Sequence, residues 1–284
     1  MRGYEFSPDS AKDHAERISH AARHWTVPLA RFGYAAKGAV YIIIGVLAAL
    51  AALNRGGRTA DSRGVFGEIL SQPYGQVMLG AVAIGLAGYA IWSLIQAIKD
   101  TENKGSGAKG VVIRLGYGVA GLIHASLAWT AVQLIVGSSS SYRGEASSKE
   151  WTAILLAQPL GQWLVGAVGV AIMIAAAVQF YQAYTAKFKE ELMWGEMGPG
   201  AELWATRVGR VGLAARGVVF GVIGIFLIIA ALHANPDEAR GLSGALRALE
   251  QQPFGPWVLG TVALGLAAYG MYMLVLAWYR RIIL

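Results

Sequence analysis

The sequence predicts an all-α integral membrane bundle of six transmembrane helices, built as three parallel two-helix repeats around a pseudo-threefold axis. One observation behind this prediction is composition. The 284-residue chain is 55% hydrophobic and only 14% charged, whereas a soluble domain carries roughly 25% charged residues. The other is that two short motifs each occur three times, and internal repeats define a whole architecture.

The two motifs alternate along the chain, and each copy opens a long apolar run. The first motif, Arg-x-Gly, begins at Arg31, Arg114 and Arg210. The second motif, Gln-Pro-x-Gly, occupies 72–75, 158–161 and 252–255. Each run has about the 20 residues that a helix needs to cross a bilayer. The six predicted spans cover 33–53, 77–98, 113–136, 161–184, 211–232 and 255–279.

A polar loop joins the two spans of each repeat and holds a short apolar-periodic stretch, at 65–70, 151–156 and 242–249. These stretches predict short amphipathic helices lying at the outer membrane interface. The proline of each Gln-Pro motif follows directly. Because proline ends one helix and is tolerated at the start of the next, the motif predicts a hinge between the short helix and the second span.

The repeats divide the chain into five parts: an N-terminal arm 1–28, repeat 1 at 29–100, repeat 2 at 112–186, a linker 187–206 and repeat 3 at 207–281. Of the 24 Lys and Arg residues, 17 lie on one side of the predicted spans, in the arm, the loops near 99–114 and 185–216, the C-terminal tail and the helix ends beside them, against 7 on the other side. Positively charged loops stay inside, so these parts and both termini are predicted to be cytoplasmic.

The formal charge of +7 comes mainly from basic residues at predicted helix ends. This position favours anionic lipid headgroups on the cytoplasmic side as partners, rather than nucleic acid. A partner in a larger membrane complex and a homo-oligomer both stay open. The chain has no cysteine, which excludes disulfides, thiolate metal sites and cysteine nucleophiles.

The repeated Arg31, Arg114 and Arg210 are candidates for a ring that binds an anion or a lipid phosphate. The alternative interpretation is that each side chain only reaches toward the membrane surface and marks the inner side. The sequence leaves both open.

Lys37 and Arg216 occupy equivalent positions about one and a half turns deeper, where repeat 2 has Ala120. A charge at that depth is costly and usually faces the bundle interior, water or a partner. The predicted spans contain no Asp or Glu, which argues against a cation-coupled transporter. These two residues are the best candidates for lining a pore or binding an anion, unless both extend to the headgroups.

Four residues further along, Tyr41, His124 and Phe220 occupy equivalent positions. Tyr41 is a further pore-lining candidate. A lone intramembrane histidine is able to ligate haem or a chlorophyll-type magnesium, but more often it hydrogen-bonds a neighbouring helix. Tyr89 and Tyr269 are expected in the interfacial aromatic belts.

The paired motifs, together with Gly-Leu-Ala-x-Tyr at 85–89 and 265–269, resemble a bacterial membrane family catalogued as domain-of-unknown-function family 1206. The resemblance covers about 29–281 and implies three tandem two-helix units in a bacterial inner membrane. Repeat 2 departs from the pattern at Ala120 and near Ala175. The family carries no established activity to transfer, so no catalytic residue follows from it.

Three functions are compatible with these observations. The first is a non-enzymatic scaffold or accessory subunit of a membrane complex, favoured by the many small-residue helix faces. The second is a small channel or facilitator for an anion or small solute, which uses Lys37 and Arg216. The third is an electron-transfer or pigment-associated subunit that binds a cofactor through His124. No spacing assembles a nucleophile, a base or a metal set, so an enzyme is not expected, and any cofactor stays unknown.

Overall fold

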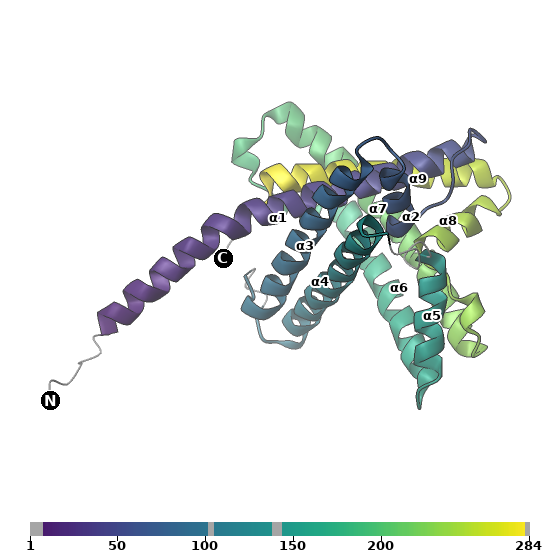
Figure 1. Cartoon of the computed structure of the whole chain (residues 1–284), viewed down its shortest axis with the longest axis horizontal. Coiled ribbons are helices and arrows are strands. Elements are labelled where there is room, and N and C mark those ends of the chain that lie inside the picture. Colours follow the sequence, from purple (N-terminus) through teal and green to yellow (C-terminus); the bar gives the residue numbers. More distant parts are fainter. Residues whose placement is uncertain (1–7, 102–104, 138–143, 282–284) are drawn as a thin grey trace.

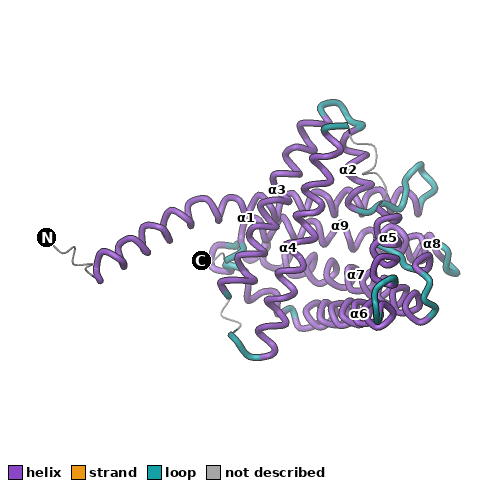
Figure 2. Tube along the Cα trace, turned by 60° about the horizontal axis from the view of Figure 1, so that its bottom comes forward, coloured by secondary structure: helices purple, strands orange, loops and turns teal. Residues whose placement is uncertain are grey.

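The computed structural model describes residues 8–101, 105–137 and 144–281, and these residues form helices, turns and loops without a strand (Figures 1 and 2). Six helices are long and apolar enough to cross a membrane. They are α1 (Pro8–Ala52), α3 (Gly75–Lys99), α4 (Ala108–Ile135), α6 (Gly161–Thr185), α7 (Pro199–Leu232) and α9 (Gly255–Tyr279). The all-α, six-span prediction is therefore confirmed.

Shorter helices occupy the connections. The three short helices predicted between the spans are α2 (Ser62–Leu70), α5 (Gly144–Leu156) and α8 (Leu242–Glu250). The described residues also form three 3₁₀ turns: η2 (Lys187–Glu191), η3 (Trp194–Glu196) and η4 (Pro236–Glu238).

The first helix is longer than the first predicted span. The sequence separates the arm 1–28 from the span at 33–53, whereas α1 runs without a break from Pro8 through Pro28 to Ala52. Its first half extends away from the bundle (Figure 1). Proline interrupts the hydrogen-bond ladder only locally, so it does not by itself mark the start of a span here.

Each Gln-Pro-x-Gly motif forms the same tight turn. The third residue is left-handed in all three copies, at Tyr74, Leu160 and Phe254, with φ between 60° and 63°. The glycine N–H then donates to the glutamine carbonyl, as at Gly255 with a distance of 2.8 Å. A Cβ on Gly255 would lie 1.7 Å from the Glu250 carbonyl oxygen, so this close approach requires glycine.

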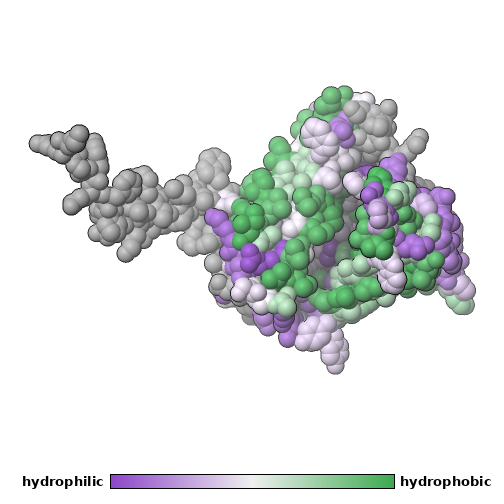
Figure 3. All heavy atoms as spheres, turned by 90° about the horizontal axis from the view of Figure 1, so that it is seen from below, coloured by the Kyte–Doolittle hydropathy of each residue, from purple (hydrophilic) through white to green (hydrophobic). Residues whose placement is uncertain are grey.

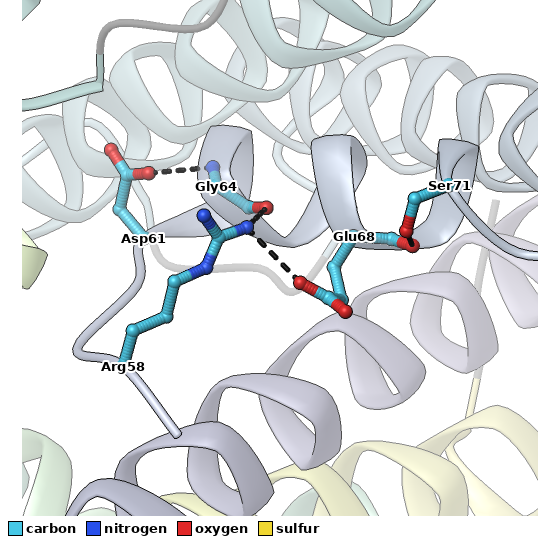
Figure 4. A network of polar contacts seen from close by, with 5 residues as sticks. All are labelled: Arg58, Asp61, Gly64, Glu68 and Ser71. Carbon is cyan, nitrogen blue, oxygen red and sulfur yellow. Dashed lines mark hydrogen bonds and ion pairs between the residues drawn. The ribbon is translucent and has the colours of Figure 1, made fainter. Parts of the chain in front are cut away.

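Polar contacts hold the short helix α2 against the loop before it (Figure 4). The carboxylate of Asp61 accepts from the N–H of Gly64 at 2.9 Å and caps the helix start. Arg58 donates to Glu68 at 3.1 Å and to the Gly64 carbonyl. The Ser71 hydroxyl donates to the Glu68 carbonyl at 2.7 Å. These contacts fix α2 over the loop that precedes it.

The linker between α6 and α7 packs onto the side of the bundle at which α3, α6 and α9 end, called the basic side below. Phe188 is buried and stacks edge-on against Tyr272. Glu191 pairs with Arg280 at 3.3 Å, and Arg280 also donates to the Tyr34 hydroxyl. The segment therefore ties together α1 and the end of α9.

The long helices pack in a cyclic order that follows the repeats. The second helix of each repeat packs against the first helix of the next, in the pairs α3–α4, α6–α7 and α9–α1. This is the pseudo-threefold arrangement that the repeats predict. Within repeats 1 and 3 the two helices also pack together, as α1–α3 and α7–α9. Among the described residues, α4 and α6 of repeat 2 form no comparable interface.

Equivalent glycines show where repeat 2 differs. A Cβ on Gly33 would lie 2.6 Å from the backbone of Tyr89, and one on Gly212 would lie 2.5 Å from Tyr269. A Cβ on the equivalent Gly116 would meet no atom within 4 Å. Small residues permit close helix approach, but in repeat 2 this face of α4 has no helix against it.

The missing interface is visible from outside. In Figure 1, α4 and α6 diverge toward the bottom of the view, and Figure 3, seen from below, shows a hollow between hydrophobic ridges. In the most apolar stretch of each helix, only 11% of α4 and 22% of α6 is buried, against 56% of α9. The threefold ring is therefore open between the two helices of repeat 2.

Candidate functional site

The centre of the bundle holds polar and aromatic side chains that come from all six long helices. We call this set the central cluster. Its members, in chain order, are Lys37, Tyr89, His124, Gln179, Arg216 and Tyr269. Lys37 and Arg216 lie close enough to interact electrostatically with each other, so the cluster forms one site.

Lys37 lies deep in its span. Eleven residues separate it from Thr26 and fifteen from Ala52, the ends of that span. At 1.5 Å per residue these separations are about 16 Å and about 22 Å, further than a lysine side chain extends. Lys37 is only 5% exposed. Its ammonium donates to the Tyr89 hydroxyl at 3.0 Å and lies 4.2 Å from the centre of that ring, so it does not extend to the headgroups.

Arg216 forms the corresponding contacts in repeat 3. Its guanidinium donates to Oε1 of Gln179 at 3.1 Å. It lies 4.4 Å from the ring centre of Phe220 and 4.9 Å from that of Tyr269. The candidate Tyr41 packs edge-on against Tyr269, with ring centres 4.8 Å apart, and interacts with the guanidinium. Aromatic faces attract cations, so the rings hold this charge in place.

Two hydrogen-bond donors of the cluster have no partner. These are Nε of Arg216 and Nε2 of Gln179, both inaccessible to solvent. Gln179 as a whole is 6% exposed. A buried donor without an acceptor costs about 1–3 kcal/mol, and more for a charged group. Both atoms would be satisfied by an acceptor placed beside them.

The central cluster contains two cations and no carboxylate. The predicted spans contain no Asp or Glu, and neither Lys37 nor Arg216 forms an ion pair in the part of the chain that the structure describes. Burying an ion costs several kcal/mol. Contact between a desolvated cation and an aromatic ring offsets only about 2 kcal/mol of that cost. The cluster therefore has a net positive charge suited to an anion.

Two of the repeats build the same cation–tyrosine pair. Lys37 of α1 pairs with Tyr89 of α3, and Arg216 of α7 faces Tyr269 of α9. Tyr89 and Tyr269 are each the fifteenth residue of their helix. They occupy the middle of the bundle, and the expectation that they belong to interfacial belts is wrong.

Repeat 2 has Ala120 and Ala175 at the positions of this pair. These small residues lie on α4 and α6, the two helices that do not pack together. The third position of the pseudo-threefold cluster therefore has neither the cation nor the tyrosine.

His124 lies next to this third position. Its Nδ1 bonds to the Ala120 carbonyl at 2.7 Å, and its ring centre lies 4.4 Å from that of Tyr89. Because a carbonyl oxygen only accepts, Nδ1 carries the proton and Nε2 is left as an acceptor. Among the described residues no three His, Asp or Glu side chains gather to hold a metal ion. Binding of a cofactor through His124 stays a prediction.

The three repeated arginines have separate surroundings. Arg114 donates to the carbonyls of Ala97 and Ile98, both at 2.8 Å, and so caps the end of α3. The side chains of Arg31 and Arg210 are exposed. Arg31 borders an open pocket of about 260 Å³ on the α1–α9 surface. These contacts hold helix ends in place, and binding of an anion by the three arginines together stays a prediction.

Sequence reasoning missed the roles of Gln179 and of the two tyrosines. The signal for the tyrosines was available, because both end the Gly-Leu-Ala-x-Tyr motif in the middle of a span. For Gln179 nothing in the spacing indicated that Arg216 is its partner, since the contact joins different repeats.

The fold and the cluster define a multi-pass membrane protein made of three tandem two-helix repeats with a positively charged interior. Comparison with known proteins agrees with this class. The family model "Domain of Unknown Function (DUF1206)" matches residues 32–100, 115–186 and 211–280. The chain therefore belongs to this family.

One relative is an uncharacterized protein, YxxB, of Bacillus subtilis (strain 168). The two sequences are 38% identical over 265 residues, covering 93% of this chain and 95% of the relative. No solved structure matches.

Proposed function

We propose that this protein is a non-enzymatic facilitator that binds a small anionic group inside the membrane and lets it pass through the bundle. The observation that carries the proposal is a pair of cations inside the bundle, the buried Lys37 and the half-buried Arg216. Both have aromatic neighbours but no carboxylate partner in the described residues. This geometry moves the preference from the scaffold, which composition favoured, to anion binding.

The energetics explain why an anion suits the site. Removing one partner of a buried ion pair costs about 3–5 kcal/mol because it leaves a charge uncompensated. The central cluster holds two such charges and two unpaired donors, so an anion would offset part of the cost of building it. A carboxylate or phosphate oxygen accepts from guanidinium, amide and ammonium donors alike.

The proposal includes the orientation that the charge distribution predicts. The basic side, with Lys99, Arg114 and Arg280, faces the cytoplasm of a bacterial cell, and both termini lie there. Anionic headgroups of the inner membrane then contact the exposed Arg31 and Arg210.

An efflux assay tests the function. Purified protein is reconstituted into vesicles loaded with phosphate, chloride or acetate, and release is compared with that of the double variant Lys37→Met plus Arg216→Met. We expect wild-type release of at least one anion above empty vesicles, and loss of that release in the double variant. The control Arg55→Met changes an exposed arginine outside the cluster and is expected to keep the wild-type rate. Equal release by wild type, double variant and empty vesicles would refute the proposal.

The accessory-subunit alternative keeps one observation in its favour, the wide exposure of α4 and α6. A partner helix packed on these surfaces would bury them. Mild extraction from native membranes tests this alternative, because an accessory subunit should elute with a second membrane protein in fixed ratio.

A further inference from the structure

The opening between α4 and α6 lies beside the central cluster. Both helices contribute a cluster residue, His124 on α4 and Gln179 on α6, yet the helices do not pack on each other. His124 is partly exposed. Ala120 and Ala175, the small residues at the third position of the cluster, precede these two residues by one helical turn on the same helices.

The walls of the opening are apolar. On α4, Leu115 and Val119 flank the unpartnered Gly116, and their side chains are 63% and 57% exposed. On α6, Ile174 and Val178 are 60% and 47% exposed. Side chains of this kind match acyl chains and give no hydrogen bonds to a hydrated ion. The opening thus joins an apolar surface to a cationic interior.

The inner end of the opening has unsatisfied donors. Nε2 of Gln179 and Nε of Arg216 are buried and have no partner. The repeats that hold Lys37 and Tyr89, or Arg216 and Tyr269, fill this level with a long cation and a ring, whereas repeat 2 has only methyl groups there. The unpaired donors of Gln179 and Arg216 and the small side chains of Ala120 and Ala175 therefore belong to the same level of the bundle.

We propose that the opening between α4 and α6 admits a single-chain anionic amphiphile, a fatty-acid-like carboxylate, sideways from the bilayer. Its carboxylate accepts from Arg216 and Gln179 at the third position, and its acyl chain lies between the apolar faces of α4 and α6. This inference rests on the proposed anion site and names its substrate class.

The depth of the cluster decides between a single-chain carboxylate and a phospholipid. The equivalent Lys37 lies about 16 Å along its helix from one end of the span and about 22 Å from the other. A phospholipid would have to bring a bulky, zwitterionic or anionic headgroup with two chains to that level. A carboxylate is smaller, becomes neutral on protonation, and pairs with a guanidinium through two oxygens.

Binding of lauric acid carrying bromine on its chain tests the inference, because bromine quenches nearby tryptophans and Trp129 lies on α4. The full-length protein in a non-ionic detergent is titrated with brominated laurate, with brominated phosphatidylglycerol and, in a thermal-shift assay, with acetate. We expect saturable quenching by laurate, an affinity at least tenfold lower in Arg216→Met, and a similar loss in Ala175→Phe, which fills the third position. Arg55→Met, which changes an exposed arginine outside the cluster, is the matched control and should bind as wild type does.

Each result decides a different point. If acetate stabilises the wild type but not Arg216→Met, and laurate binds no more tightly than acetate, the lateral route is wrong and the anion site stands. If neither binds, both proposals fail. Saturable quenching by phosphatidylglycerol alone refutes the single-chain substrate. A dimer that buries α4 and α6 and excludes laurate would assign the opening to a second copy and refute the inference as well. Elution at the wild-type volume shows that each variant is folded, and Gln179→Leu replaces any that is not.

Discussion

The three equivalent glycines Gly33, Gly116 and Gly212 allow a direct test of the open ring. We predict that Gly33→Ala and Gly212→Ala destabilise the protein while Gly116→Ala does not. In repeats 1 and 3 the new Cβ would lie 2.6 and 2.5 Å from the backbone of the facing helix, whereas in repeat 2 it would meet nothing within 4 Å.

The expected magnitudes follow from these distances. The facing atoms belong to the backbone of Tyr89 and Tyr269, so they cannot rotate away, and the helices would have to separate by about 1 Å to reach ordinary contact. Overpacking of this kind typically costs about 1–3 kcal/mol. On an unpacked helix face, replacing glycine by alanine instead gains about 0.5–1 kcal/mol. The two classes of variant should therefore differ by about 2–4 kcal/mol and in sign.

Unfolding in mixed micelles with a rising fraction of denaturing detergent measures these differences. The three variants share the same substitution, the same sequence motif and the same position in a span, so each serves as a control for the others. A loss of stability in Gly116→Ala equal to that in Gly212→Ala would show that α4 and α6 pack together, and the argument for an opening would be wrong.

Three further predictions concern the framework. Gly255→Ala should lower the free energy of unfolding by about 3 kcal/mol or more, since its Cβ would lie 1.7 Å from a carbonyl oxygen. The control Gly80→Ala, whose Cβ would meet no atom within 4 Å, should change it by no more than about 0.5 kcal/mol. Unfolding midpoints of the two variants measure the difference. Glu191→Gln should cost about 1–3 kcal/mol by leaving the buried Arg280 without its carboxylate, and limited proteolysis should then cut the linker faster. Asp61→Ala should remove the cap of α2 and cost about 1 kcal/mol, seen as faster amide exchange in that helix alone.

The architecture was predictable because it depends on features that are local in sequence. Length and hydropathy fix a membrane span, and the recurrence of Arg-x-Gly and Gln-Pro-x-Gly fixes how spans group into repeats. The short helices α2, α5 and α8 follow from the periodic stretches before each Gln-Pro. None of these inferences requires knowing which helix faces which.

The opening between α4 and α6 was not predicted, since packing between helices depends on pairs of faces. The sequence did show that Ala120 and Ala175 depart from the repeat pattern. It did not show that Gly116, which keeps the motif, lacks a facing helix. The same limit applies to Gln179 and Arg216, whose contact joins two repeats. The continuity of α1 through Pro28 was missed because a proline between a polar and an apolar segment is more often a boundary.

The coincidence of two departures in repeat 2 is the strongest argument that the opening serves binding. A packing defect alone would separate α4 from α6 but would not require alanine at 120 and 175, where the other repeats hold the cation and the tyrosine. Loss of the charged pair alone would leave a closed ring with an inaccessible cavity. Repeat 2 has lost both, at the same level of the bundle, beside the unpaired donors of Arg216 and Gln179. Three identical repeats would form a closed ring with no lateral opening. The divergence of repeat 2 from the other two copies creates that opening.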